Sequence, residues 1–114
     1  MSAAFPIPAV AHVSTARVRF IPVIGDSMEP TLKRNNMVAV VPVSGYRAEG
    51  LYVLDVLGQP NIVRCQALSA NSLRVWHDNP AYGGNTVTRE WFEEALLGKV
   101  AAVLEITDRS LLEA

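Results

Sequence analysis

The segment GDSMEPTL, residues 25–32, contains residue types that could build a nucleophilic site. A serine is a useful nucleophile only when its hydroxyl lies on a rigid turn, a base accepts its proton, and backbone amides face the developing oxyanion. Gly25 permits a tight turn before Ser27, and Pro30 stiffens the chain that follows. The amides of Asp26 and Ser27 could then stabilise a negative oxygen. The same residues are also compatible with a purely structural loop.

Two other groups of residues could carry nucleophilic chemistry, and neither is favoured. His77 and Asp78 invite a Ser-His-Asp triad, but neighbouring residues of a strand point to opposite faces, which argues against Asp78 orienting His77. Cys65 follows Arg64, a cation that could lower the pKa of the thiol, but the two side chains diverge on a strand. We therefore expect Cys65 to be buried and inert.

The acidic and aromatic residues near the C-terminal part are interpreted as structural. Glu90, Glu93 and Glu94 have no histidine beside them in the sequence and are expected to form a solvated helix face rather than a metal site. Trp76, Trp91 and Phe92 are expected in the core or in an interface. No cofactor or metal is predicted.

The composition describes a small and nearly neutral globular domain. The chain has 114 residues, half of them apolar and 18% charged, a length that corresponds to one domain. Its 10 Lys and Arg against 11 Asp and Glu lack the cationic excess that phosphate binding needs. A single cysteine fits a reducing cytoplasm, and no apolar stretch approaches the roughly 18 residues of a membrane span. We therefore expect no direct contact with nucleic acid or membrane.

The pattern of apolar segments and turns predicts a mainly β domain. Residues 1–16 are rich in Ala and Pro and indicate a linker or arm, so the compact domain is expected over 17–114. Strands are expected at 17–24, 37–43, 51–57, 62–68, 73–77 and 99–106. Pro22 places the first strand at an edge. One short helix is expected after the N-cap Thr88, with Gly98 beyond its end.

The segment GDSMEPTL resembles the nucleophile box of the LexA/UmuD-type serine peptidase domain, the C-terminal domain of LexA-like and phage repressors and a distant relative of signal peptidases. Four further segments resemble parts of this domain in the same order: EGLYVLDV at 49–56, NIVRCQAL at 61–68, VWHDNPAY at 75–82 and LLGKVAAV at 96–103. The last resembles the closing dimerisation strand. The resemblance implies a coiled antiparallel sheet with one short helix.

The same resemblance implies a Ser–Lys dyad, in which a lysine with a depressed pKa takes the proton of the serine hydroxyl. Ser27 matches the nucleophile, and the amide of Asp26 is expected in the oxyanion hole. The position of the lysine is occupied by Arg64, 37 residues after Ser27. A guanidinium with a pKa above about 12 cannot act as a general base, although it could hydrogen-bond Ser27 or pair with a carboxylate. Lys33 and Lys99 fall outside the matching segment.

These matches predict the dimerisation and regulatory domain of a LexA/phage-repressor-like transcriptional regulator, of the kind that acts in the SOS response or in phage, with lost or weak self-cleavage. Family members cut their own chain at Ala-Gly or Cys-Gly, and neither pair occurs in this sequence. A homodimer is expected through 99–106 with Leu111 and Leu112, and a DNA-binding domain or partner repressor on another segment or chain. Two alternatives stay open: an active serine endopeptidase that uses Ser27, and a stand-alone anti-repressor that forms mixed dimers.

Overall fold

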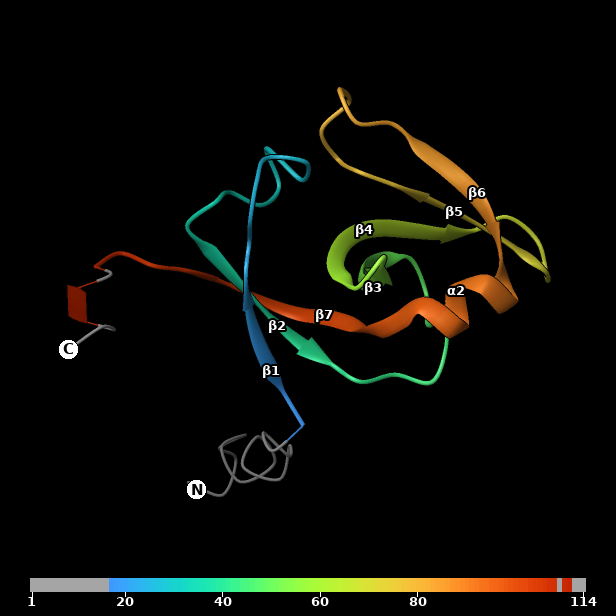
Figure 1. Ribbon diagram of the computed structural model, residues 1–114, viewed down its shortest axis with the longest axis horizontal. Helices are drawn as coiled ribbons and strands as arrows, with labels where there is room; N and C mark the ends of the chain where they lie inside the picture. Colours follow the sequence, from blue (N-terminus) through green and yellow to red (C-terminus); the bar gives the residue numbers. More distant parts are fainter. Residues whose placement is uncertain (1–16, 109, 112–114) are drawn as a thin grey trace, which may run out of the picture.

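The computed structural model describes residues 17–108, 110 and 111, so the expected arm at 1–16 and Leu112 lie outside the described residues. Seven strands and one helix are formed (Figure 1). In chain order they are β1 (Arg19–Pro22), β2 (Asn36–Val41), β3 (Gly50–Val56), β4 (Gln59–Ala67), β5 (Ser72–Trp76), β6 (Gly84–Thr88), α2 (Arg89–Ala95) and β7 (Leu96–Glu105). The fold is mainly β with one short helix, which confirms the prediction from the sequence.

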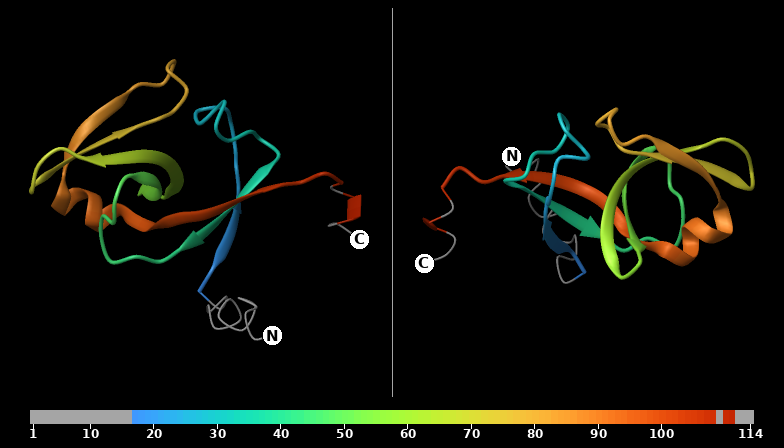
Figure 2. Two further views of the ribbon diagram at one scale, coloured as in Figure 1. Left: turned by 180° about the vertical axis from the view of Figure 1, so that it is seen from behind. Right: turned by 45° about the horizontal axis from the view of Figure 1, so that its top comes forward.

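All seven strands form one antiparallel sheet in the order β1-β2-β7-β3-β4-β5-β6. The first strand lies at an edge and ends at Pro22, as the missing amide hydrogen of proline predicts. Strands β3 to β6 curl, and α2 contacts β3, β5 and β6 (Figure 2). The last strand, β7, runs beside β2 for most of its length and joins the two parts of the sheet.

Both faces of β3 and β4 carry buried apolar residues, and those of each face belong to a different core cluster. The helix-side cluster consists of Tyr52, Leu54, Val63, Cys65, Leu73, Val75 and Phe92, and the loop-side cluster of Val23, Met28, Leu32, Val38, Val40 and Val53. On β4, Val63 and Cys65 face the first cluster while Ile62 packs against the second. This division follows from the alternation of side chains along a strand. Arg64 therefore lies on the loop-side face of β4, and Val63 lies on the helix-side face.

The structure differs from the sequence-based prediction around α2. Strand β6 was not predicted. Gly98 lies beyond the end of α2 at Ala95, as expected, but it already belongs to β7, which begins at Leu96 rather than at Lys99. A Cβ atom at Gly98 would meet Val40 Cγ1 at 2.6 Å and the carbonyl oxygen of Val41 at 2.7 Å. Glycine is therefore present because β2 and β7 approach each other closely here. Among the described residues, no helix has the length and apolar character needed to cross a membrane.

Candidate functional site

Ser27 lies on the loop between β1 and β2, and two buried side chains hold this loop in place. Gly25 has a φ of 81°, a left-handed conformation that glycine adopts without strain and that turns the chain toward Ser27. Met28 and Leu32 insert into the loop-side cluster and are 2% and 0% exposed. The amide of Leu32 donates to the carbonyl of Met28 at 2.9 Å. The half-buried Ser27 is therefore positioned by its neighbours on a fixed turn, as the sequence predicts.

The loop between β5 and β6 holds the Ser27 loop from the other side, at the same end of the sheet (Figure 1). The Asn79 side chain donates to the carbonyl of Asp26 at 3.0 Å, and its backbone amide donates to the carbonyl of Ser27 at 3.0 Å. The hydroxyl of Tyr82 donates to the Asp26 carboxylate, and this hydrogen bond raises the pKa of Tyr82 above its ordinary value. Asp26 thus anchors the two loops to each other. The oxyanion role of its amide stays a prediction.

Arg64 forms a bidentate ion pair with Asp78. Its Nε and Nη2 donate to Asp78 Oδ1 and Oδ2, both at 2.7 Å. The pairing of β4 with β5 places Arg64 opposite Trp76, so Asp78, two residues further on, lies within reach of the guanidinium. The side chains are 27% and 11% exposed, which makes this a partly buried pair. The sequence allowed Arg64 either to hydrogen-bond Ser27 or to pair with a carboxylate, and the structure shows the pair with a carboxylate.

This ion pair also touches the Ser27 loop. Thr31 Oγ1 donates to Asp78 Oδ2 at 2.6 Å, and the amide of Asp78 lies 3.5 Å from the sulfur of Met28. The Asp78 carboxylate therefore accepts hydrogen bonds from β4 and from the nucleophile loop together. Arg64, at the position that the resemblance gives to the base, is connected to the loop of Ser27 through this shared carboxylate.

The ion pair fixes the charge state of both groups. The hydrogen bonds from Arg64 hold the pKa of Asp78 below its ordinary value, and the bond from Thr31 acts in the same direction. The hydrogen bonds to Asp78 raise the pKa of Arg64 further above its already high ordinary value. Opposite charges in contact each favour the other's charged form. Arg64 consequently keeps its proton near neutral pH, and it cannot accept one from Ser27.

The two lysines of the chain lie elsewhere. Lys99, on β7, donates through Nζ to the carbonyl of Arg47 and lies 5.2 Å from the centre of the Tyr52 ring. Lys33 is exposed at the end of the loop before β2, where its amide donates to the Asn36 side chain at 2.9 Å. Neither lysine lies on β4, the strand to which the resemblance assigns the base.

The structure does not assemble the alternative Ser-His-Asp triad. The Asp78 carboxylate accepts from Arg64 and Thr31. Within the described part of the chain, Nδ1 of His77 is buried and has no hydrogen-bond partner, although this is the atom that the aspartate of such a triad orients. His77 and Asp78 follow the end of β5 at Trp76, so the strand alternation expected for this pair does not apply to them.

The remaining candidates are structural. Cys65 is fully buried in the helix-side cluster, and burial raises the pKa of its thiol to about 11, as expected of an inert cysteine. Glu90, Glu93 and Glu94 are exposed on α2, which confirms a solvated face. Phe92 is fully buried and Trp91 is 44% exposed. In residues 17–108, 110 and 111, no three side chains of His, Cys, Asp or Glu are grouped as metal ligands would be.

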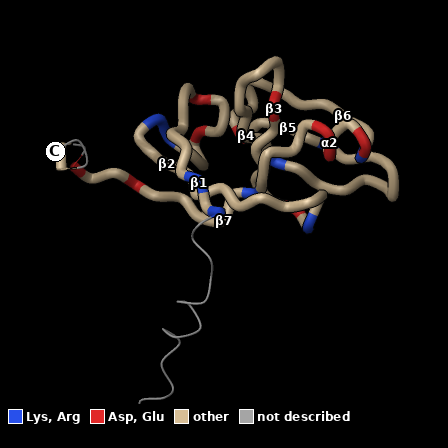
Figure 3. Tube along the Cα trace, turned by 60° about the horizontal axis from the view of Figure 1, so that its bottom comes forward, with Lys and Arg blue, Asp and Glu red and all other residues tan. Residues whose placement is uncertain are grey.

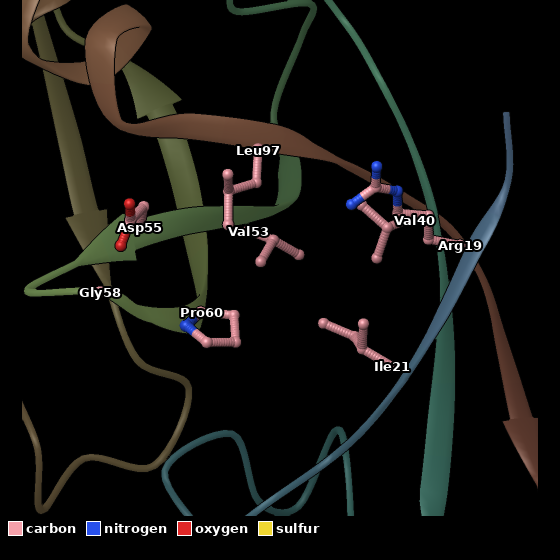
Figure 4. Close-up of a pocket in the computed structure, with 8 residues that line it drawn as sticks. All are labelled: Arg19, Ile21, Val40, Val53, Asp55, Gly58, Pro60 and Leu97. Atoms are coloured by element: carbon pink, nitrogen blue, oxygen red, sulfur yellow. The ribbon is translucent and has the colours of Figure 1, made fainter.

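Two neighbouring cavities extend from Ser27 along the loop-side face. The first, of about 80 Å³, is lined by Ser27 together with Ile21, Pro60 and Ile62. The second, of about 290 Å³, shares Ile21 and Pro60 with the first, and Figure 4 shows Arg19 and Asp55 on opposite sides of it. The groove between β1 and the β3–β4 hairpin is thus mostly apolar, with one charge of each sign at its far end.

The sequence reasoning missed three contributors to this site: Asp78 as the partner of Arg64, Thr31 as the second donor to that carboxylate, and Tyr82 as the partner of Asp26. Asn79 and Tyr82 lie in the segment VWHDNPAY that carried part of the resemblance. The resemblance therefore pointed to this segment, but it did not predict the contacts of the two residues. The signal for Asp78 was its position just beyond the strand that pairs with Arg64.

A serine on a glycine turn, held against a curled antiparallel sheet by the loop that follows β5, is the arrangement of a serine peptidase domain of the LexA/UmuD type. The family model described as Peptidase S24-like matches residues 2–101, and the chain belongs to this family. The matched range includes both Ser27 and Arg64. No curated protein gives a match to the chain.

Proposed function

We propose that the chain is the dimerisation and regulatory domain of a LexA/phage-repressor-like transcriptional regulator, and that Ser27 supports little or no peptidase chemistry. The observation that carries the proposal is the ion pair of Arg64 with Asp78 at the position of the family's base. Membership of the Peptidase S24-like family supports a domain of the LexA-like repressor and peptidase class.

The loss of activity follows from the protonation chemistry. A Ser–Lys dyad works because a desolvated amine can lose its proton near neutral pH and then accept the proton of the hydroxyl. A guanidinium keeps its proton far above neutral pH, and the Asp78 carboxylate strengthens this preference. Ser27 therefore keeps its position on the loop without a base at Arg64.

The end of β7 is the surface proposed for dimerisation. Residues 101–105 of β7 are exposed, and they pair with β2 on one side while β3 reaches β7 only between Leu96 and Lys99. Val103 and Leu104 are 47% and 44% exposed. A hollow of about 430 Å³ beside them is lined by Phe20, Met37, Leu104, Ile106 and Leu111. Exposed apolar side chains next to unpaired strand backbone favour association with a second copy.

DNA binding is assigned to other parts of the regulator. Acidic and basic positions are interspersed along the described chain (Figure 3), and the net charge is −1. Pairing two DNA-binding heads through one dimer raises operator affinity by effective concentration, so the pairing domain need not touch DNA. A stand-alone anti-repressor would use the same surface to form mixed dimers.

The peptidase part of the proposal is tested by incubating the chain with a peptide that contains an Ala-Gly bond, at neutral and alkaline pH, and analysing the products by mass spectrometry. The Ser27→Ala variant is the matched control. We expect no fragments that depend on Ser27. Fragments that disappear in Ser27→Ala would instead support the active endopeptidase, with another group or water as the base.

A further inference from the structure

A cavity of about 430 Å³ lies on the face of β3 and β4 opposite to the Ser27 groove. Its apolar lining comes from Leu54, Val63, Val75 and Val87, of which the first three belong to the helix-side cluster. Strands β3 to β6 curl around this side of the sheet (Figure 2). The cavity is therefore the open mouth of the curled part of the sheet, and it is independent of the Arg64 site.

Four residues with polar side chains line the same mouth, namely Asn61, His77, Asn85 and Thr86. Asn61 pairs with Leu54, and Asn85 pairs with Val75, so each carboxamide lies on the face of its buried partner. His77 follows Val75 by two residues and extends the same face beyond β5, where its amide donates to the carbonyl of Gly83 at 3.1 Å. Strand alternation thus brings two carboxamides and one imidazole to an otherwise apolar cavity.

His77 is not committed to one hydrogen-bonding state. Its Nδ1 is buried and has no partner in the described residues. The hydrogen bond made by one ring nitrogen normally selects the tautomer and so decides whether the other nitrogen donates or accepts. Because no protein atom makes this selection at Nδ1, the imidazole can either donate a hydrogen bond to a ligand in the mouth or accept one from it. A buried polar atom without a partner is also a cost that folding alone does not explain.

We infer that this mouth binds a neutral, planar heterocycle that carries a hydrogen-bond donor and an acceptor side by side, in the manner of a nucleobase. The lining contains no Asp, Glu, Lys or Arg, so it offers no carboxylate, ammonium or guanidinium group to form an ion pair with a charged ligand. A carboxamide offers a donor and an acceptor together and matches such an edge, as asparagine does with adenine. Trp91, 44% exposed, supplies an aromatic wall at the rim. The volume lies within the range of small-molecule sites.

The inference is tested by titrating the ¹⁵N-labelled full chain with free adenine and following the amide resonances. Toluene serves as the planar apolar probe and benzoate as the planar charged probe. Adenine is expected to shift the amides of Val63, Val75 and Val87 saturably, with a Kd of about 1 mM or lower. Toluene and benzoate are expected to bind at least about tenfold more weakly. Toluene has no hydrogen-bonding group, and the benzoate carboxylate would lose water in a lining that holds no ammonium or guanidinium group.

Two variants complete the test. Asn85→Ala is expected to weaken adenine binding about fivefold to tenfold, whereas Asn71→Ala, an exposed asparagine in the turn before β5, leaves it unchanged. His77→Phe keeps a ring of similar shape and is expected to weaken adenine more than toluene. The inference is overturned if adenine and toluene bind equally, if the shifts centre on Arg74 and Trp76 on the outer face of β5, or if Asn85→Ala binds adenine as the unaltered chain does.

Discussion

The Arg64 guanidinium donates two parallel hydrogen bonds of 2.7 Å to the two carboxylate oxygens of Asp78. The carboxylate in turn accepts from Thr31 on the Ser27 loop. The positive charge of Arg64 is thus paired with the negative charge of Asp78. The site stabilises a permanent positive charge at the position to which the resemblance assigns the neutral amine of a Ser–Lys dyad.

Restoring the lysine alone is expected to be insufficient. In Arg64→Lys the ammonium would lie near the Asp78 carboxylate, which favours the protonated form and keeps the pKa of the lysine high. In the double variant Arg64→Lys/Asp78→Asn that carboxylate is removed. We expect cleavage of an Ala-Gly peptide in trans to be at least about tenfold faster in the double variant than in the single one, the effect of one pKa unit.

The control for this gain is the triple variant that also carries Ser27→Ala, which should be inactive. Equal inactivity of the single and double variants, with both folded, would show that more than the base has been lost.

The ion pair should make the domain sensitive to acid. The pKa of Asp78 is lowered in the folded state, so its contribution to the free energy of unfolding is complete above the ordinary value of about 4 and is lost as the pH falls through the lowered value. Asp78→Asn is expected to reduce the free energy of unfolding at neutral pH by about 1 to 3 kcal/mol. The difference between variant and unaltered chain should shrink in acid.

Urea denaturation at neutral pH and at about pH 3 measures both effects. Asp55→Asn, which changes an exposed carboxylate, is the matched control and should leave the free energy of unfolding nearly unchanged. A difference for Asp78→Asn that stays constant down to acid would contradict the role assigned to the ion pair.

Association through the end of β7 predicts that one charge at its exposed apolar surface separates the dimer. Leu104→Asp would bury an unpaired carboxylate in the interface and should give a monomer in sedimentation velocity at concentrations where the unaltered chain is a dimer. Leu57→Asp is the control, because Leu57 is 98% exposed at the tip of the β3–β4 hairpin. A dimer that survives Leu104→Asp, or one that Leu57→Asp disrupts, would place the interface elsewhere.

The tip of the β3–β4 hairpin offers a stabilising substitution. Leu57 and Gly58 have φ values of 53° and 82° between the paired residues Val56 and Gln59, as in a two-residue turn of type I′. Leucine is strained in this left-handed conformation, and asparagine is well tolerated there. Leu57→Asn is expected to raise the free energy of unfolding by about 1 kcal/mol. Thermal unfolding should show a higher Tm, and a lower Tm would contradict this reading of the turn.

Most of the fold could be predicted from the sequence because the buried strands carry strong local signals. Strands β2 to β5 contain β-branched and apolar residues, glycines lie between β2 and β3 and between β3 and β4, and Pro22 indicated the edge. Strand β6 was missed because Gly84 and Asn85 were interpreted as part of a turn and Thr88 as the N-cap of the helix, and pairing with β5 makes residues 84–88 a strand. Tertiary pairing decided this element rather than local propensity.

The sequence indicated individual residues of the candidate site but not the contacts between them. The turn before Ser27 and the permanent charge of Arg64 follow from residue type alone. The partner of Arg64 does not, because its identity depends on the register of β4 against β5, which the sequence does not specify to one residue. The same register places His77 in the mouth and Asp78 beside Arg64.

The reactivity of the Ser27 hydroxyl is the quantity that decides the account, and a fluorophosphonate probe measures it without any assumption about the substrate. The unaltered chain, Ser27→Ala and Arg64→Lys/Asp78→Asn are treated at about pH 7 and about pH 9, and the labelled peptide is identified by mass spectrometry. We expect the unaltered chain to be labelled no faster than Ser27→Ala at both values, and the double variant to be labelled at Ser27. Rapid labelling of Ser27 in the unaltered chain at about pH 7 would contradict the account, because the hydroxyl would then have a working base.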